Sequence, residues 1–354
     1  MKRFDFLIVG QGLAGAVLTY LISQTNKTFL VISDNEISSS KVAAGMFNPV
    51  GGKKILKTWL ADDLLSSSKI FYKDFERFLN TNFYHCQNII QIFQDNQEKE
   101  QIEKRLEDIN YLKYLENNSN VYNFLENPLG QVNIKDGGWL NLKKMIDKFT
   151  DFLQEKSKLL TETFSYDQII FKDNQYYYQD MIFNQIVFCE GYKSTVNPYF
   201  NYLPFQLSKG EVLIIETQTK LPDSILKKGI YLVNLKNHLY KVGATTEWKN
   251  LNNNPTENGL EYLKTKLNNL IDVKYEIISH QAGIRPTVSD KKPLLGEHPE
   301  YKNMYIFNGL GTKGVMLSPY FAEKLLNLII YNVDLPIEVD IKRFLKYYKP
   351  SFNF

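Results

Sequence analysis

A group of glycines near the N-terminus has the spacing of a phosphate-binding turn. Gly10, Gly12 and Gly15 stand between a compact apolar run, 4–9, and a run with helical spacing, 14–24. Gly10 permits a tight turn, Gly12 lets backbone N–H groups approach a pyrophosphate, and Gly15 lets the helix pack on the strand. The helix N-terminus would then point at the phosphates. The predicted dinucleotide-binding residues of this turn are Gly10, Gly12, Leu13, Ala14 and Gly15. A glycine-rich turn without a ligand is the alternative.

An acidic residue at the end of the second apolar run, 28–32, would bind the ribose of an adenosine. The expected position holds Ser33, and Asp34 follows one residue later. The Asp34 carboxylate could accept hydrogen bonds from both ribose hydroxyls, and its charge would disfavour a 2′-phosphate, which argues against NADP. Asp34 is therefore the candidate, with a solvated loop aspartate as the alternative.

The composition indicates a globular protein with a small partner. The chain has 354 residues, of which 44% are hydrophobic and 23% charged, and its formal net charge is +3. A large core can form, and nothing in the charge demands nucleic acid or an anionic membrane. Cys86 and Cys189 stand in apolar surroundings, as reduced and buried thiols of a cytosolic protein do. The four histidines lack metal-binding spacing, so we expect no metal site.

The start of the chain also has features of a signal peptide. Lys2 and Arg3 precede an apolar stretch, 4–22, but Asp5, Gln11 and three glycines interrupt it. A strand, a turn and a helix explain the stretch better than a membrane span does. We therefore expect no membrane partner and a cytoplasmic location.

Residue periodicity predicts the remaining elements. Helices are expected at 60–80, 97–116, 141–156 with Asn141 as its cap, 256–271 and 318–331. Three β-type runs between 164 and 189, with a turn at Asp173-Asn174, predict a β-meander. A second antiparallel group is expected from strands at 211–216, 230–235, 238–243 and 275–280. A further strand, 304–308, precedes a glycine-rich turn and a helix, which repeats the pattern at the N-terminus.

The segment Ser38–Pro49, with Trp59 downstream, resembles the segment after the second strand of D-amino acid oxidases and glycine oxidases. In that family, hydroxyl residues matching Ser39 and Ser40 contact the FAD phosphates. Hydroxyls and free N–H groups suit phosphate and flavin carbonyls, and small residues let the backbone come close. The family's backbone beside the flavin ring matches Ala44, Gly45 and Met46. The resemblance also assigns Asn48, Phe164 and Gly191 to the cofactor site. A serine-rich loop packed by small residues is the alternative.

Two C-terminal stretches extend the resemblance: 282–286, followed by Asp290 and 293–296, and 309–316. The second reads as a strand, a glycine turn and a helix start. Free N–H groups and the helix dipole there could face the flavin edge on which negative charge grows during reduction. The resemblance assigns to the cofactor site Gly309, Gly311, Thr312, Lys313, Gly314, Val315 and Met316.

Two residues are the expected catalytic-site groups. Arg285 matches the family arginine that binds the substrate carboxylate, and its planar fork of donors suits a bidentate contact. A structural arginine bound to carbonyls is the alternative. Tyr231, thirteen positions inclusive before Gly243, stands where the family has a carboxylate-binding tyrosine, although an ordinary strand aromatic fits as well. Glu190-Gly191 departs from the family, which usually has a small residue before this glycine.

The resemblance implies an α/β (α+β mixed) fold. A Rossmann-like FAD-binding domain with a β-meander would be interleaved with an antiparallel-sheet substrate domain, as in glutathione-reductase-type and D-amino acid oxidase-like proteins. The FAD-binding domain would comprise residues 1–84, 136–204 and 281–354. The substrate-binding domain would comprise residues 85–135 and 205–280.

The function implied is FAD-dependent oxidation of the C–N bond of a small amino acid or secondary amine, such as a D-amino acid, glycine or sarcosine. The family does this by hydride transfer to flavin N5, and the electron acceptor would be oxygen or an unknown compound. One alternative is a tRNA-modification-type oxidoreductase acting on a carboxymethylaminomethyl base. It would need a basic surface, for which Lys53, Lys54 and Lys57 are candidates. Another alternative is a flavin-binding protein without turnover.

Overall fold

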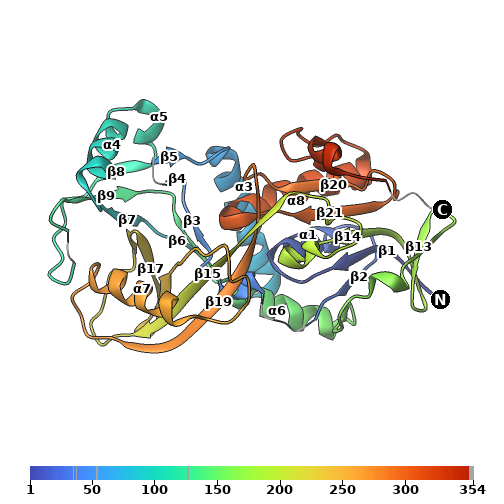
Figure 1. Ribbon diagram of the computed structural model, residues 1–354, viewed down its shortest axis with the longest axis horizontal. Helices are drawn as coiled ribbons and strands as arrows, with labels where there is room; N and C mark the ends of the chain where they lie inside the picture. Colours follow the sequence, from blue (N-terminus) through green and yellow to red (C-terminus); the bar gives the residue numbers. More distant parts are fainter. Residues whose placement is uncertain (35, 37, 53–54, 126, 351–354) are drawn as a thin grey trace.

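Two large β-sheets lie side by side along the long axis of the molecule (Figure 1). The computed structural model describes residues 1–34, 36, 38–52, 55–125 and 127–350. The N-terminus lies at the end of the molecule formed by the first sheet, and two long strands of the second sheet cross its centre (Figure 1). The mixed α/β architecture predicted from the sequence is therefore confirmed.

The first sheet is built on parallel strands. Strand β1 (Lys2–Val9) pairs with β2 (Phe29–Ile32) on one side and with β14 (Met181–Phe188) on the other, and β21 (Met304–Asn308) pairs with β14. Helix α1 (Leu13–Ser23) joins β1 to β2, which confirms the predicted βαβ unit. The edges of the sheet are completed by β11 (Leu159–Leu160), β12 (Ile170–Lys172), β13 (Gln175–Tyr178) and β20 (Leu294–Glu297).

The predicted β-meander is also present. Strands β12, β13 and β14 pair antiparallel in sequence order, and the turn between β12 and β13 consists of Asp173 and Asn174. Both turn residues have positive φ, 53° and 61°. Aspartate and asparagine tolerate this left-handed conformation better than most residues do.

Helices cover one face of the first sheet. Helix α1 packs with α3 (Ala61–Leu79), α6 (Leu142–Glu155) and α8 (Gly314–Tyr331) around one apolar core. The side chain of Asn141 accepts a hydrogen bond from the Lys144 N–H, as the predicted cap of α6 should. No helix within the described ranges is long and apolar enough to cross a membrane.

The second sheet has the order β19-β15-β18-β17-β16-β7-β9-β8. Its strands are β7 (Ile89–Ile92), β8 (Leu115–Asn117), β9 (Gln131–Ile134), β15 (Phe205–Glu216), β16 (Ile225–Lys228), β17 (Ile230–Lys236), β18 (Leu239–Gly243) and β19 (Glu276–Val288). Helix α7 (Glu257–Asn268) packs on one face of this sheet. The opposite face carries Val233 and Tyr231 and packs against residues such as Val50 and Met46. This inner face is the one that reaches the cavity described below.

Short elements connect the two sheets. They are α2 (Ser39–Val42), β3 (Met46–Phe47), β4 (Val50–Gly51), β5 (Leu56–Lys57), β6 (Tyr84–Cys86) and β10 (Gly138–Leu140). Four 3₁₀ segments add η1 (Tyr166–Gln168), η2 (Gly191–Thr195), η3 (Gly311–Lys313) and η4 (Ile341–Tyr347). Strand β10 pairs with both β3 and β6, so the chain after α2 is held against the segment that precedes α6.

Three predictions about these elements were wrong. The region 97–116 is not one helix: α4 (Asn96–Leu106) ends, and Asp108 caps a new short helix, α5 (Ile109–Leu112), by accepting from the Asn110 N–H. Ile109 and Leu112 are 77% and 43% exposed, so they do not continue a buried stripe. Strand β19 continues to Val288 and carries Arg285 within it, and α8 begins at Gly314 rather than at residue 318.

The prediction of two buried thiols was half right. Cys189 is buried at the end of β14, whereas Cys86 is exposed at the end of the short strand β6. An apolar sequence neighbourhood did not bury Cys86, because the last residue of an edge strand can point to solvent. Both cysteines are free.

Candidate functional site

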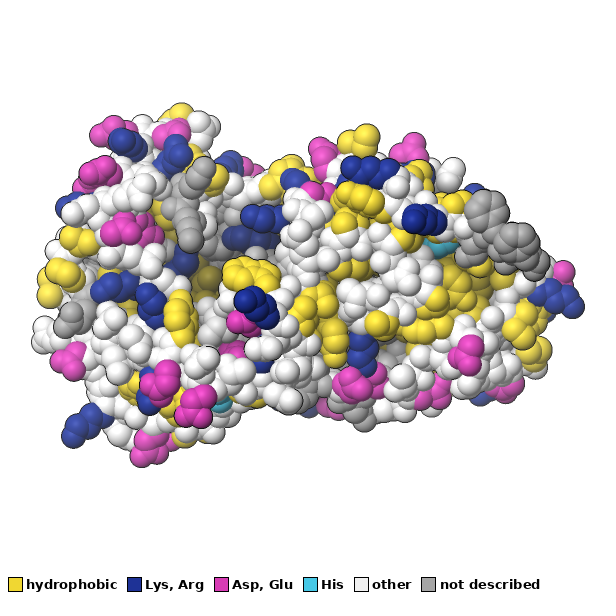
Figure 2. Space-filling model, in the orientation of Figure 1, with side chains coloured by type: hydrophobic (Ala, Val, Ile, Leu, Met, Phe, Trp, Pro, Cys, Tyr) yellow, Lys and Arg dark blue, Asp and Glu magenta, His cyan; other side chains and the backbone are white. Residues whose placement is uncertain are grey.

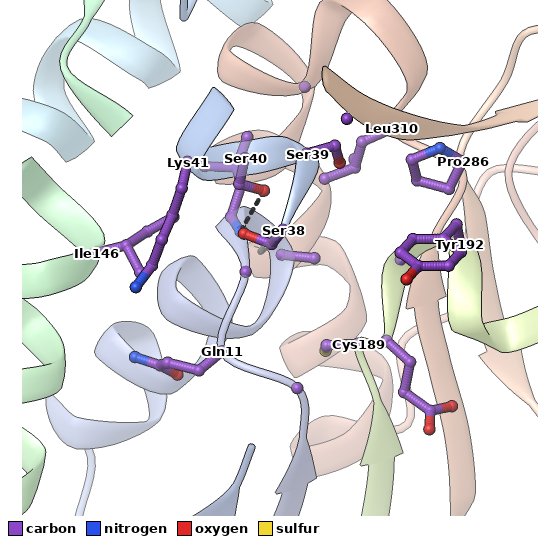
Figure 3. Close-up of a pocket in the computed structure, with 18 of the residues that line it drawn as sticks. Gln11, Ser38, Ser39, Ser40, Lys41, Ile146, Cys189, Tyr192, Pro286 and Leu310 are labelled. Carbon is purple, nitrogen blue, oxygen red and sulfur yellow. Dashed lines mark hydrogen bonds between the residues drawn. The ribbon is translucent and has the colours of Figure 1, made fainter. Parts of the chain in front are cut away.

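A cavity of about 470 Å³ lies between the ends of the parallel strands and the inner face of the second sheet. The surface of the molecule is hollowed between its two halves (Figure 2). Segments far apart in sequence meet in the cavity, including the turn after β1, helix α2, the end of β14, and strands β15, β17 and β19. The close-up in Figure 3 shows side chains from several of these segments around one space.

Most of the predicted cofactor residues line this cavity. The lining residues among them are Gly10, Gly12, Leu13, Ala14, Ser33, Asp34, Ser39, Ser40, Ala44, Gly45, Met46, Phe164, Gly191, Gly311, Thr312, Gly314 and Val315. Both predicted catalytic-site residues, Arg285 and Tyr231, line it too. The structure therefore brings the four sequence blocks together at one place.

The turn after β1 is closed so tightly that two of its positions require glycine. Gly10 has φ +102°, and a Cβ there would lie 2.5 Å from the carbonyl oxygen of Cys189. A Cβ at Gly15 would lie 1.9 Å from the carbonyl oxygen of Gly10. Gly12, the N-cap of α1, is less crowded, since its Cβ would meet only the Ser40 hydroxyl at 3.3 Å. Gly12 therefore has room on its cavity side, which is where a phosphate would approach.

Polar atoms around this turn lack partners. The side-chain amide of Gln11 and the hydroxyl of Ser38 are buried, line the cavity, and hydrogen-bond to no described residue. Ser40 accepts a hydrogen bond from the Leu13 N–H at 3.0 Å, which is the dashed line in Figure 3. Buried polar groups are normally satisfied, so these atoms indicate a polar ligand in the cavity. The fit to a dinucleotide pyrophosphate is good.

The chain after α2 passes close to other backbone. Gly45 has φ +67°, and a Cβ there would lie 2.0 Å from the carbonyl oxygen of Leu140. The next residue, Met46, pairs in β3 with Trp139 of β10. The small residues Ala44 and Gly45 thus let this segment run between β10 and the cavity.

Charged groups just after β2 are paired. The Asp34 carboxylate binds the Lys193 ammonium at 2.5 Å, and Lys193 also binds Glu36 at 2.8 Å. The Ser33 hydroxyl accepts a hydrogen bond from the Gln11 N–H at 3.2 Å. Ser33 and Asp34 both line the cavity. Either residue, the expected one or its neighbour, is therefore within reach of the same ligand.

Glu190 is a lining residue that the sequence analysis did not predict. Its carboxyl group accepts hydrogen bonds from the Tyr166 hydroxyl at 2.5 Å and from the Asn197 side-chain amide at 2.7 Å. Burial raises the pKa of Glu190 to about 7. The sequence did carry a signal for Glu190, because this acid stands where related sequences have a small residue.

Arg285 and Tyr231 meet from different strands. The guanidinium of Arg285 lies over Gly210, where a Cβ would come within 1.8 Å of it. It donates to the carbonyl of Thr245 over long distances, 3.4 and 3.5 Å, and forms no ion pair with a described residue. Burial lowers the pKa of Arg285 and raises that of Tyr231 to about 12, and the Tyr231 oxygen accepts the Ala44 N–H. The arginine is cationic and the phenol neutral at physiological pH.

Five predicted cofactor residues do not line the cavity: Gly15, Asn48, Gly309, Lys313 and Met316. Gly15 and Met316 are buried where α1 and α8 pack. The Lys313 ammonium donates to the Asn48 side-chain oxygen at 2.6 Å, which ties the turn before α8 to the loop after β3. Gly309 has φ +71° and continues the backbone past Asn308, whose side chain donates to the Gly191 carbonyl at 2.8 Å.

Comparisons with known proteins identify the family of the chain. The family model described as FAD dependent oxidoreductase, DAO, matches residues 5–328. A glycine oxidase from Geobacillus kaustophilus is 29% identical over 115 residues, which are 31% of this chain and 30% of that protein. A tRNA 5-methylaminomethyl-2-thiouridine biosynthesis bifunctional protein from Leptospira interrogans is 20% identical over 390 residues, which are 96% of this chain and 59% of that protein.

Similarity of fold extends further than similarity of sequence. The crystal structure of glycine oxidase from Geobacillus kaustophilus superimposes with a TM-score of 0.79 at 16% identity and covers 97% of this chain and 98% of that one. The sequence matches, in contrast, span about a third to three-fifths of the curated relatives.

Proposed function

The chain belongs to the FAD dependent oxidoreductase (DAO) family, and from that premise we propose that this flavoenzyme oxidises the C–N bond of a small amino acid or secondary amine. FAD, when bound, supplies the two-electron acceptor that such an oxidation needs. The protein contributes binding, orientation and electrostatics. We also propose the division into an FAD-binding domain, 1–84, 136–204 and 281–354, and a substrate-binding domain, 85–135 and 205–280.

The residues around the first turn would hold the cofactor. The Leu13 N–H at the start of α1 is bound by Ser40, so the N–H groups that follow it would face a pyrophosphate. The side chains of Gln11 and Ser38, which have no partner among the described residues, offer further polar contacts. The N-terminus of α8 also lacks a side-chain cap, and Gly314 at its start lines the cavity. Its N–H groups and dipole would stabilise negative charge on the part of the cofactor that lies nearest.

The observation that carries the proposal is the Arg285 guanidinium. A cation partly buried in a cavity without an acidic partner among the described residues is costly, and a carboxylate ligand would lower that cost. The planar guanidinium can bind both oxygens of a carboxylate, which would fix the position of an amino acid. The guanidinium donates to the carbonyl of Thr245, which does not neutralise its charge.

Tyr231 would supply a second donor to the same carboxylate. With a pKa of about 12, its hydroxyl stays protonated at neutral pH. Because its oxygen already accepts the Ala44 N–H, its own O–H is the group left to offer. Tyr231 would thus bind and orient the substrate rather than accept a proton from it.

A second candidate function is oxidation of a carboxymethylaminomethyl group on tRNA. It is favoured by the relative from Leptospira interrogans, whose match runs over 96% of this chain. Such a substrate needs a basic surface at the cavity. Lys53 and Lys54 lie outside the described residues, and Lys57 forms an ion pair with Asp62 at 2.5 Å. Asp62 also binds Lys113 at 2.6 Å. Lys57 is thus held in an ion-pair network and is the one described residue of the predicted basic cluster, which favours the small substrate.

The test is anaerobic flavin reduction by a matched pair of amines, sarcosine and dimethylamine, which differ by the carboxylate. Arg285→Lys keeps the charge and loses the fork, so we expect the rate with sarcosine to fall at least about tenfold, or ~1.4 kcal/mol of transition-state stabilisation. The rate with dimethylamine should start low and change little. Arg77→Lys, at an exposed ion pair with Asp74, is the control and should change neither rate.

Two outcomes would contradict the proposal. Equal losses with both amines would mean that Arg285 supports the fold or the flavin and does not bind a carboxylate. An absence of flavin bleaching with any member of a panel of glycine, sarcosine, proline and D-amino acids would favour the flavin-binding protein without turnover.

A further inference from the structure

One cation in the wall of the cavity has no part in the site as described so far. Among the described residues that line the cavity, three are cationic: Lys41, Lys193 and Arg285. Lys193 is bound by two carboxylates just after β2, and Arg285 belongs to the second sheet. Lys41 lies in α2, directly after the two hydroxyl residues that the family resemblance assigned to the FAD phosphates. It is therefore the lining cation whose role is open.

Lys41 stands next to the turn that would receive a pyrophosphate. Its neighbour Ser40 accepts a hydrogen bond from the Leu13 N–H at 3.0 Å, at the start of α1. The same hydroxyl is the atom that a Cβ at Gly12 would meet, at 3.3 Å. In Figure 3 the Lys41 side chain extends from α2 on the same side of the space as Gln11. Helix α2 is thus anchored at the N-terminus of α1, and Lys41 is the next side chain after that anchor.

The ammonium group of Lys41 is bound by a carboxylate that has a second partner. Asp147 on α6 binds Lys41 at 2.8 Å and Lys143 at 2.5 Å. The side chains of Lys41 and Asp147 are both 35% exposed, so solvent weakens their ion pair. Burial acts to raise the pKa of Asp147, but the two ammonium groups lower it below its usual value. Asp147 is therefore ionised, and it would keep Lys143 as a partner if Lys41 turned to another anion.

A pyrophosphate would compete well for this ammonium group. It is a dianion, and a charge-assisted hydrogen bond to it inside a cavity is stronger than a partly solvated pair with one carboxylate. The side chains of Gln11 and Ser38, which have no partner among the described residues, could also contact a phosphate. Both are neutral, so they would leave the charge of the pyrophosphate uncompensated. Lys41 is the lining side chain next to the turn that could compensate it.

We propose that Lys41 binds the pyrophosphate of FAD, and that Asp147 competes with the cofactor for the same ammonium group. This inference rests on the proposed function only in placing FAD in this cavity, and it holds for any amine substrate. A structural role for the ion pair is the alternative. The pair joins α2 to α6, and both helices contribute residues to the cavity wall, so it could hold the two helices together around the cofactor.

The experiment measures how tightly variants of the holoenzyme bind FAD. The holoenzyme is diluted and the released FAD is followed by its fluorescence, which gives the Kd of each variant. Lys41→Met should raise the Kd at least about tenfold, because a charge-assisted contact with a phosphate is lost. Asp147→Asn should lower the Kd about threefold, because the ammonium group no longer has a competing carboxylate. The two variants, which break the same ion pair, should therefore have opposite effects.

Lys143→Met is the matched control. Lys143 binds the same carboxylate as Lys41, but its side chain is 68% exposed and is not among the described residues that line the cavity. The Kd for FAD should change less than about twofold in this variant. Lys41→Arg keeps the charge and should retain most of the affinity, which separates loss of the charge from loss of folding.

The sign of the effect of Asp147→Asn decides between the two roles. A higher Kd in both Asp147→Asn and Lys41→Met would overturn the phosphate contact and assign the ion pair to joining α2 and α6. An unchanged Kd in Lys41→Met would also overturn the contact, while FAD binding and the proposed oxidation would stand. A parent protein that binds no FAD would contradict the proposed function itself, and this inference would fall with it.

Discussion

The two ends of the cavity are built in different ways. At the end proposed to bind the nucleotide, here called the nucleotide end, a single βαβ unit supplies a glycine turn, a helix N-terminus and the end of β2, all within the first 34 residues. At the substrate end, Tyr231 and Arg285 come from β17 and β19 and meet only because the long strands pair. One end is local in sequence and made largely of backbone, whereas the other depends on side chains brought together by the sheet.

The charges follow the same division. At the nucleotide end, Asp34 and Lys193 neutralise each other at 2.5 Å. At the end proposed to bind the substrate, Arg285 forms no ion pair with a described residue. Paired charges suit a cofactor that stays bound. Unpaired charges suit a substrate of opposite charge, which forms the missing ion pair when it binds. The predictions below test this division, beginning with the largest expected effect.

Gly12→Val should abolish useful FAD binding. The added side chain would project beside the Ser40 hydroxyl, into space that a pyrophosphate needs, so we expect affinity to fall at least about a thousandfold, or ~4 kcal/mol. The measurement is FAD content after purification and titration of the apoprotein. Gly12→Ala should lose much less, because its single methyl group meets Ser40 at 3.3 Å. Stoichiometric FAD in the valine variant would contradict the assignment of this turn.

The nucleotide end was the more predictable because its signals are local. The glycine spacing, the two flanking runs and the cap at Asn141 each depend on residues a few positions apart. The helix expected at 97–116 failed for a local reason as well: periodicity continued through Asp108, which caps a new helix.

The substrate end could be predicted only through the family resemblance. The sequence around Tyr231 does not predict that Lys227 is its cross-strand partner. It also does not predict that the Arg285 side chain lies over Gly210. Those contacts follow from strand register, which a single sequence specifies weakly. Glu190 was visible as a departure, but its role needed its partners Tyr166 and Asn197, and the second of these lies seven residues away beyond a 3₁₀ turn.

Glu190 should make the stability of the protein depend on pH. Its pKa rises from 4.5 to about 7 on burial, so the folded state holds a proton that the unfolded state has lost. Stability should be highest below pH 4.5 and fall as the pH rises through 7, by about 3 kcal/mol for this group. Glu190→Gln removes the ionisation and should flatten the fall. The measurement is the free energy of unfolding of FAD-loaded protein between pH 5 and 8.

A matched control for this group is Glu100→Gln at an exposed position of α4. It should keep the pH dependence of the parent. A Glu190 variant with the same slope as the parent would mean that Glu190 is ionised in the folded protein. The nucleotide end would then hold an unpaired charge, which would weaken the comparison between the two ends.

Tyr231→Phe tests the substrate end with a smaller change. Removing the hydroxyl removes one donor to the carboxylate, so the Kd of sarcosine should rise about tenfold, or ~1.4 kcal/mol, with FAD content unchanged. Tyr240→Phe is the control, because Tyr240 lies on the opposite face of the same sheet and accepts the Leu221 N–H. If the two variants behave alike, Tyr231 is an ordinary strand aromatic and the substrate end depends on Arg285 alone.

Asp34→Ala should have the smallest effect, and its interpretation needs a second variant. Two hydrogen bonds to a partly solvated ribose are worth little, so we expect FAD affinity to fall about fivefold, or ~1 kcal/mol. Asp34 also binds Lys193, so the loss could reflect a displaced Lys193 side chain rather than a missing ribose contact. In a Lys193→Met background that second effect is absent. A fivefold loss that persists there assigns the ribose to Asp34, whereas a loss that disappears assigns Asp34 to positioning Lys193. Unchanged affinity in both backgrounds would assign ribose recognition to the Ser33 hydroxyl or to backbone groups, and the nucleotide end would then depend on backbone even more than its glycine turn indicates.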